Sequence, residues 1–96
     1  MNHVRPHYNL EAWKEAITLV KAVYQLTKDF PADELYGLTS QMRRCAISIP
    51  SNIAEGAARS SRKEFAQFLS VAKGSLSKLD TQLLIAVELG YMDHGS

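Results

Sequence analysis

The sequence predicts an all-α protein, and three observations support this class. Glycine and proline are sparse, with five and three residues in a chain of 96. No window alternates apolar and polar residues as a half-buried strand does. Apolar residues instead recur at spacings of three and four along three long stretches, as on one face of a helix. We therefore expect helices at about 9–29, 39–57 and 62–89, packed as one helical-bundle domain that spans residues 1–96.

The first expected helix begins at Asn9, which can act as the N-cap, with Glu11 in the first turn, where the helix dipole favours an acidic residue. We interpret Trp13 as a packing residue rather than a platform for a ligand, since a large aromatic side chain on an apolar stripe usually packs. The helix should end at Phe30-Pro31, because the residue before a proline is pushed out of the α region. The apolar stripe consists of Trp13, Ala16, Ile17, Val20, Val23 and Tyr24.

The second expected helix begins near Thr39 or Ser40 and contains Pro50. A proline inside a helix removes one backbone hydrogen bond and clashes with the carbonyl four residues earlier, so a kink or a break is expected at Pro50. Nearby polar side chains can bond the backbone groups that the proline frees; they are Ser48, Ser51 and Asn52. The predicted inward face consists of Met42, Cys45, Ala46, Ile49 and Ile53.

Two polar residues and two glycines have predicted structural roles. Asn52 and Glu55 share a helix face, and we expect them to form a polar clasp that holds an arginine from a neighbouring helix. Gly56 allows either a positive φ or a close contact between helices. Gly74, inside the third helix, costs about 1 kcal/mol relative to alanine, so we expect another backbone to approach it closely.

The third expected helix has the clearest start, because Ser61 and Glu64 fit the S-x-x-E capping box before an apolar run. It should stop at Gly90. Its heptad stripe consists of Phe65, Leu69, Ala72, Leu76, Leu79, Leu83 and Ala86. A second apolar set consists of Ala66, Phe68, Val71, Leu84 and Val87. Two partner helices would not cover both sets, so a further partner must bury the remainder.

Basic residues are concentrated in the middle of the chain. The net charge is only +1, yet residues 40–80 hold seven basic and three acidic side chains. RNA phosphates would be the natural partner of such a surface, and an oligomer that repeats it would gain avidity. The alternative is a solvated face with local pairs such as Glu55 with Arg59. The candidate nucleic-acid-binding residues are Arg43, Arg44, Arg59, Arg62, Lys63 and Lys73.

Catalytic chemistry has little support. Cys45 is the only cysteine, and its place in an apolar phase favours packing over reactivity, although neighbouring arginines can lower a thiol pKa. His3 and His7 have the i,i+4 spacing of a helical metal pair, but Pro6 between them disfavours a preformed helical site, and His94 lies in the other tail. We expect no enzymatic activity, metal, cofactor or small-molecule substrate.

The sequence also carries expectations about location. The longest uninterrupted apolar run, 83–87, is far shorter than the roughly 20 residues that cross a bilayer as a helix. The first residues lack the apolar core of a secretory signal, and a single cysteine permits no internal disulfide. We therefore expect a cytoplasmic protein without a membrane association.

The run from Gly37 to Gly56 resembles the signature of the four-helix-bundle proteins of the 23S rRNA intervening-sequence family. Further blocks that resemble the family follow the same order, at residues 10–16, 30–31, 34–38 and 72–76. The resemblance covers about residues 8–92. It implies a bacterial protein that folds as an up-and-down antiparallel four-helix bundle. It also implies that the protein can assemble into five-fold rings, as family members do. A related branch, the accessory variability proteins of diversity-generating retroelements, binds nucleic acid and a reverse transcriptase.

The chain departs from the family pattern in two ways. Family members continue past the turn at Gly90 into a fourth helix, whereas this chain stops at Ser96, as a truncation or a three-helix variant would. Lys73 and Lys78 stand where the family would have an arginine and a glutamate. Together these features predict a non-enzymatic homo-oligomer that binds RNA or a ribonucleoprotein partner. The alternative is a scaffold that docks another polypeptide and has no nucleic-acid role.

Overall fold

The computed structural model describes residues 6–93, which form three α-helices and two 3₁₀ turns. The helices are α1 (Glu11–Thr27), α2 (Leu38–Ala57) and α3 (Arg62–Glu88). The turn η1 (Pro6–Asn9) precedes α1, and η2 (Ala32–Glu34) lies between α1 and α2. No strand occurs in this part of the chain. The predicted all-α class is confirmed, and the predicted helix ends differ from the observed ones by at most two residues.

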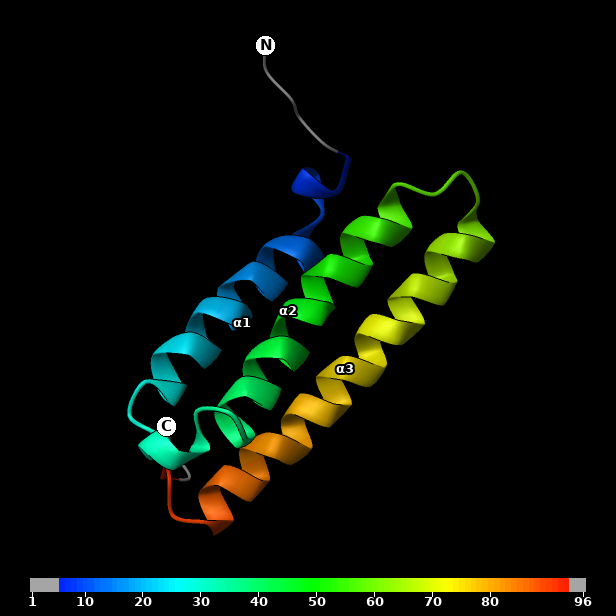
Figure 1. The fold of residues 1–96 in the computed structure, drawn as a ribbon. Coiled ribbons are helices and arrows are strands. Elements are labelled where there is room, and N and C mark those ends of the chain that lie inside the picture. The colour runs from blue at the N-terminus through cyan, green and yellow to red at the C-terminus, as the bar shows by residue number, and fades with distance from the viewer. Residues whose placement is uncertain (1–5, 94–96) are drawn as a thin grey trace.

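Successive helices run antiparallel, and α2 lies between α1 and α3 (Figure 1). The middle helix packs against both of its neighbours, whereas no Cα of α1 lies within 8 Å of a Cα of α3. After α3 the chain turns back across the end of the helices toward the connector between α1 and α2 (Figure 1). The backbones of α1 and α3 therefore do not pack directly against each other.

The hydrophobic core is centred on α2. Met42 and Ala46 are fully buried. The same core contains Val23 from α1 and, from α3, Leu79 and Ala86. All five residues of the predicted inward face of α2 are buried. Trp13 is half-buried and packs against this core, as predicted. The periodicity of α2 thus identified its buried face correctly because both neighbouring helices pack on it.

The start of α1 differs from the prediction. Leu10 rather than Asn9 occupies the N-cap position, with extended backbone and without a side-chain cap. Residues before it form the η1 turn, in which the Leu10 amide donates to the His7 carbonyl at 3.0 Å. The rings of His7 and Tyr8 lie 5.0 and 5.2 Å from the Trp13 ring. This aromatic contact, with the partly buried Leu10, directs the chain into α1 without a polar cap.

The second helix continues through Pro50, so of the kink or break predicted there the break does not occur. Ser48 Oγ donates to the Cys45 carbonyl at 2.7 Å, and Asn52 Nδ2 donates to the Ser48 carbonyl at 2.7 Å. Ser51 Oγ donates to the Ile47 carbonyl, also at 2.7 Å. The three polar side chains therefore bond carbonyls around the proline, as the sequence suggested, and Pro50 itself is buried.

The turn between α2 and α3 confirms the predicted capping box. Ser61 Oγ accepts from the Glu64 amide at 3.1 Å and donates to Glu64 Oε1 at 3.2 Å. Gly56, in the last turn of α2, is buried beside α3: a Cβ there would lie 2.8 Å from both Phe65 Cδ1 and Phe68 Cβ. The predicted close helix contact at Gly56 is thus confirmed.

The prediction for Gly74 is wrong. This glycine is exposed, and a Cβ built on it would meet no atom within 4 Å. Its side of α3 faces neither neighbouring helix, so no backbone approaches it. Among the described glycines, only Gly90 has a positive φ, at 80°, directly after α3, where the sequence predicted a stop.

None of the helices formed by residues 6–93 is both long enough and apolar enough to cross a bilayer.

Candidate nucleic-acid interface

The six predicted basic residues do not form one patch. Arg59, Arg62 and Lys63 lie together at the turn between α2 and α3. Arg44 lies in the first half of α2, about 20 Å from the end of that helix at roughly 1.5 Å per residue. The other two, Arg43 and Lys73, occupy separate surfaces again. The structure therefore divides the candidates among several environments.

Arg43 links two helices. Its Nε donates to Thr27 Oγ1 at 2.9 Å, and its guanidinium lies 4.6 Å from the centre of the Tyr24 ring. The hydroxyl of the buried Thr27 in turn donates to the Val23 carbonyl at 2.8 Å. Both contacts are made to α1: the guanidinium stacks on one of its aromatic rings, and one N–H donates to one of its hydroxyls. Arg43 therefore stabilises the α1–α2 contact.

Arg59 combines an ion pair with a ring contact. Its Nη2 lies 3.3 Å from Glu55 Oε1, and its guanidinium lies 4.9 Å from the centre of the Phe68 ring. The polar clasp was predicted to hold an arginine from a neighbouring helix, and this prediction is wrong. Glu55 instead pairs with Arg59, four residues later in the chain. Asn52 bonds the Ser48 carbonyl instead. Both charged side chains are about half exposed, so the pair is worth only a few tenths of a kcal/mol.

Arg62 and Lys63 extend this basic surface over the first turn of α3. Both side chains are exposed. Arg62 lines a shallow cavity of about 330 Å³ together with Arg59, Ser60 and Phe65. The free amides of the first helical turn add positive potential, which favours anions nearby. We call Arg59, Arg62 and Lys63 the turn surface; its composition suits phosphate contacts.

A second positive region lies in a groove between α2 and α3. The groove has a volume of about 460 Å³. It is lined by Gln41, Arg44, Cys45, Ser48, Asn52, Val71, Ser75, Lys78 and Gln82. Hydrogen bonds join its walls: Cys45 Sγ donates to the Ser75 carbonyl at 3.0 Å, and the hydroxyls of Ser48 and Ser75 are hydrogen-bonded to each other at 2.7 Å. We call this region the polar groove.

The sequence reasoning missed Lys78 and Gln82 as candidate site residues. A signal for Gln82 exists, because it follows Leu79 by three residues and precedes Ala86 by four, which places a polar side chain on the buried face of α3. Lys78 was noted only as a departure from the family pattern. Lys78 lines the same groove as Arg44 because of how α2 and α3 pack, which the spacing along one helix does not reveal.

Cys45 forms part of the inner wall of the polar groove. The side chain is buried, which agrees with the packing role predicted for it. Burial raises the pKa of its thiol, and the opposing effects of the Lys78 ammonium and the Leu79 backbone amide are smaller. A thiol held protonated is a poor nucleophile at neutral pH.

The opposite side of the molecule carries an apolar trough between α1 and α3. Its lining comprises Ala12, Ala16, Leu19, Ile49, Ile53, Leu69, Ala72 and Leu76, with Glu15 and Lys73 as its charged members. A neighbouring cavity extends it along α1 through Leu19, Val23, Leu26 and Leu83. Leu69 and Leu76 are 39% and 49% exposed. Both leucines belong to the heptad stripe that was expected to pack inward, so this part of the stripe is more exposed than predicted. In the second apolar set, Val71 and Leu84 are 53% and 57% exposed, so the predicted surplus is observed there. Lys73 belongs to the apolar trough.

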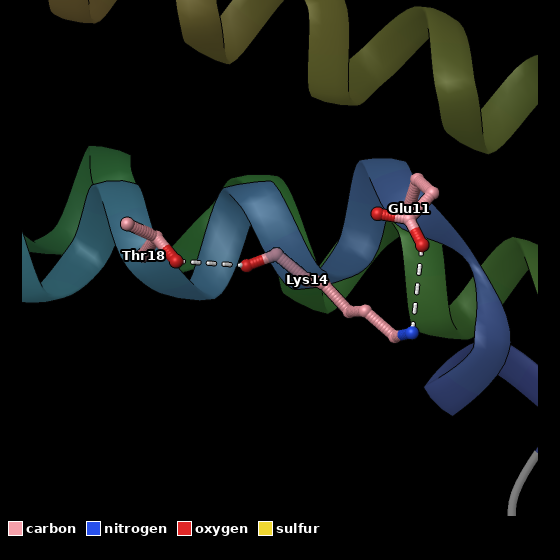
Figure 2. Close-up of polar contacts among 3 residues, drawn as sticks. All are labelled: Glu11, Lys14 and Thr18. Atoms are coloured by element: carbon pink, nitrogen blue, oxygen red, sulfur yellow. Dashed lines mark hydrogen bonds and ion pairs between the residues drawn. The ribbon is translucent and has the colours of Figure 1, made fainter.

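The other ion pair among residues 6–93 lies on α1. Figure 2 shows the ion pair of Lys14 with Glu11 on the surface of α1, at 3.5 Å, with the Lys14 side chain directed away from α3. In the same view Thr18 Oγ1 donates to the Lys14 carbonyl at 3.2 Å. His3 and His94 lie outside the described residues. Within those residues, no three metal-binding side chains gather.

The fold and these surfaces define a small all-α protein of three packed helices, with a basic turn surface, a polar groove and an apolar trough. The model of the family described as 23S rRNA-intervening sequence protein matches residues 8–96. Because this match spans nearly the whole sequence, the chain belongs to that family. No curated protein matches the chain significantly.

Proposed function

We propose that this chain is a non-enzymatic, cytoplasmic protein of bacteria that binds RNA, alone or within a ribonucleoprotein, through basic surfaces repeated on a homo-oligomer such as a pentamer. The observation that carries the proposal is the turn surface, where three basic side chains surround the start of α3. Only Arg59 among them forms an ion pair with a described residue. Arg62 and Lys63 therefore remain available to phosphates.

The low net charge is compatible with this function because the charge is unevenly distributed. A single turn surface offers few phosphate contacts, so one copy should bind weakly. An oligomer presents the same surface several times to one RNA, and the contacts then reinforce each other through a high effective concentration. Binding should therefore weaken strongly as salt rises, since each phosphate contact releases counterions.

The direct test is a titration of rRNA fragments with the purified chain at salt concentrations from about 50 to 200 mM. We expect binding at low salt that falls steeply as salt increases. Replacing both Arg62 and Lys63 by glutamine should remove most of it. The matched control is Lys14→Gln with Lys21→Gln, which removes two lysines from α1. No binding at about 50 mM salt would refute the RNA function.

A second candidate function is a scaffold that docks another polypeptide, and the apolar trough favours it. Contiguous exposed apolar surface usually marks an interface. Leu69 and Leu76 are large and partly exposed, and both line this trough. This candidate predicts capture of a partner that is insensitive to salt and is lost in Leu76→Glu, while Arg62→Gln with Lys63→Gln leaves it unchanged.

A further inference from the structure

The polar groove contains a buried amide group whose oxygen lacks a partner. Gln82 is only 8% exposed, and among the described residues its Oε1 accepts no hydrogen bond. A buried polar atom without a partner destabilises the folded state, and a methionine at this position would avoid that cost. The position therefore holds an acceptor that a bound molecule could satisfy.

The same groove is positively charged. Arg44 and Lys78 line it, and none of its nine lining residues carries a carboxylate. The ion pairs among the described residues are Lys14 with Glu11 and Arg59 with Glu55, so neither Arg44 nor Lys78 is neutralised there. Two unpaired cations in one groove favour an anion, with phosphate as a natural ligand for a guanidinium and an ammonium.

A phosphate alone would leave Gln82 unsatisfied, because a phosphodiester carries no proton to donate. The ligand must therefore combine an anion with a nearby hydroxyl or N–H group. The terminal amide of glutamine turns about a soft torsion, which can bring Oε1 toward such a donor. The groove volume of about 460 Å³ falls within the range of roughly 300–1,000 Å³ that small organic ligands occupy.

We propose that the polar groove binds a ribonucleotide unit, with its phosphate between Arg44 and Lys78 and its ribose 2′-hydroxyl donating to Gln82 Oε1. The 2′-hydroxyl supplies the donor that a deoxyribose lacks. Ser48 and Asn52 add polar groups along the wall. The unit is either a free nucleotide or part of an RNA chain; the latter form rests on the function proposed above.

The test compares three probes by calorimetric titration at one fixed salt concentration: uridine 5′-monophosphate, its 2′-deoxy analogue and an oligouridylate. The groove variants are Lys78→Met and Gln82→Met. The matched control is Lys73→Met, which removes the same charge from the same helix but lies in the apolar trough. Urea unfolding of each variant checks the fold, and Gln82→Met should be at least as stable as the wild type because it removes the unpaired oxygen.

We expect uridine monophosphate to bind more tightly than its deoxy analogue. Each groove variant should weaken that binding about tenfold, and Lys73→Met should change it by less than about twofold. The proposal is overturned if neither the nucleotide nor the oligouridylate binds, or if both groove variants bind as tightly as the wild type.

The outcomes separate this proposal from the proposed function. RNA binding that survives both groove variants, yet disappears when Arg62 and Lys63 are replaced, would place RNA on the turn surface. If uridine monophosphate binding also survived both groove variants, the groove would be refuted and the RNA function would stand. Conversely, a nucleotide that binds in the groove while RNA does not bind would support the groove and refute the RNA function.

Discussion

At the scale of single residues, packing decides the chemistry of the side chains. Arg43 and Arg44 are neighbours in sequence, yet Arg43 is bonded to Thr27 while Arg44 faces the polar groove. Cys45, the next residue, is buried with its thiol bonded to the Ser75 carbonyl. Adjacent helical positions point about 100° apart, so Arg43 contacts α1 whereas Arg44 and Cys45 line the polar groove, Arg44 exposed and Cys45 buried.

Cys45 should react slowly in the folded protein. Burial raises the pKa of its thiol above 9.0, so the protonated form is favoured in the native state. Its contribution to stability is complete below pH 9.0 and is lost as the pH rises through the raised native value. Modification by a disulfide reagent at pH 8 should therefore be much slower than in urea. Equal rates in the two states would contradict this assignment.

At the scale of secondary-structure elements, the two helical glycines of α2 and α3 differ in what surrounds them. Gly56 lies against Phe65 and Phe68, whereas Gly74 faces open space. Glycine lowers helix stability wherever it occurs, through its backbone entropy. Replacing a helical glycine by alanine therefore lowers the stability of the protein only where a neighbouring element occupies the place of the new Cβ.

The two glycines allow a matched pair of variants. Gly56→Ala should destabilise the protein by about 1 kcal/mol or more, because its Cβ would overlap Phe68 and force α2 and α3 apart. Gly74→Ala should stabilise it by about 0.5–1 kcal/mol. Urea unfolding measures both. Destabilisation by Gly74→Ala would mean that another chain packs closely against this face.

The connector between α1 and α2 is tied to the end of the described chain by Glu34. Its Oε1 accepts from the Leu38 amide at 2.9 Å, and Tyr91 Oη donates to its Oε2 at 2.7 Å. The Phe30 and Tyr91 rings lie 5.5 Å apart beside this bond. The carboxylate thus caps the start of α2 and holds the segment after α3 against the connector.

The contact between Glu34 and Tyr91 should stabilise the fold only between an acidic and an alkaline limit of pH. The bonds from Leu38 and Tyr91 lower the pKa of Glu34 below 4.5, so its contribution is present above pH 4.5 and is lost as pH falls through the native value. The bond to Glu34 raises the pKa of Tyr91 above 10.0, so that contribution is present below pH 10.0 and is lost as pH rises through its native value.

Glu34→Ala and Tyr91→Phe should therefore each lower the melting temperature at pH 7. The effect of Glu34→Ala should shrink at pH 3, because the contribution of the carboxylate declines as the pH falls below 4.5 toward its lowered native pKa. Thermal unfolding followed by circular dichroism at the two pH values measures this. The same decrease at both pH values would show that the carboxylate charge contributes nothing.

At the scale of the whole molecule, the three helices form an open structure. The radius of gyration is 15.0 Å, against about 12–13 Å for a compact domain of this length. The principal extents are 44 × 31 × 25 Å. Several large side chains of α3 remain 39% to 57% exposed: Leu69, Val71, Leu76, Leu84 and Ile85. A further packing partner would bury this surface and stabilise the fold.

The expectation of a homo-oligomer can be tested through the apolar trough. Light scattering of the purified chain should show a discrete oligomer, and Leu76→Glu should shift it toward the monomer because a charge would then be buried at the contact. The control is Ser77→Glu, on the exposed side of the same helix turn. A monomeric wild type would contradict the proposed oligomer.

Much of the fold follows from local patterns in the sequence. The spacing of apolar residues predicted three helices and the buried face of α2, and Ser61 with Glu64 marked the start of α3. These features depend on contacts within one helix or one turn, which the order of residues specifies directly. The start of α1 was missed because ring contacts and the η1 turn replace a polar cap there.

The candidate site was predicted less well, for a different reason. Periodicity assigns a residue to a face of its own helix, but the rotation and offset of neighbouring helices decide which faces meet. The sequence by itself determined the helices, their charges and the surplus of apolar surface on α3. Only the tertiary structure separated Arg43 from Arg44 and Lys73 from Lys78, and brought Arg44, Lys78 and the unpaired Gln82 into one groove, because side-chain packing between α2 and α3 sets their register.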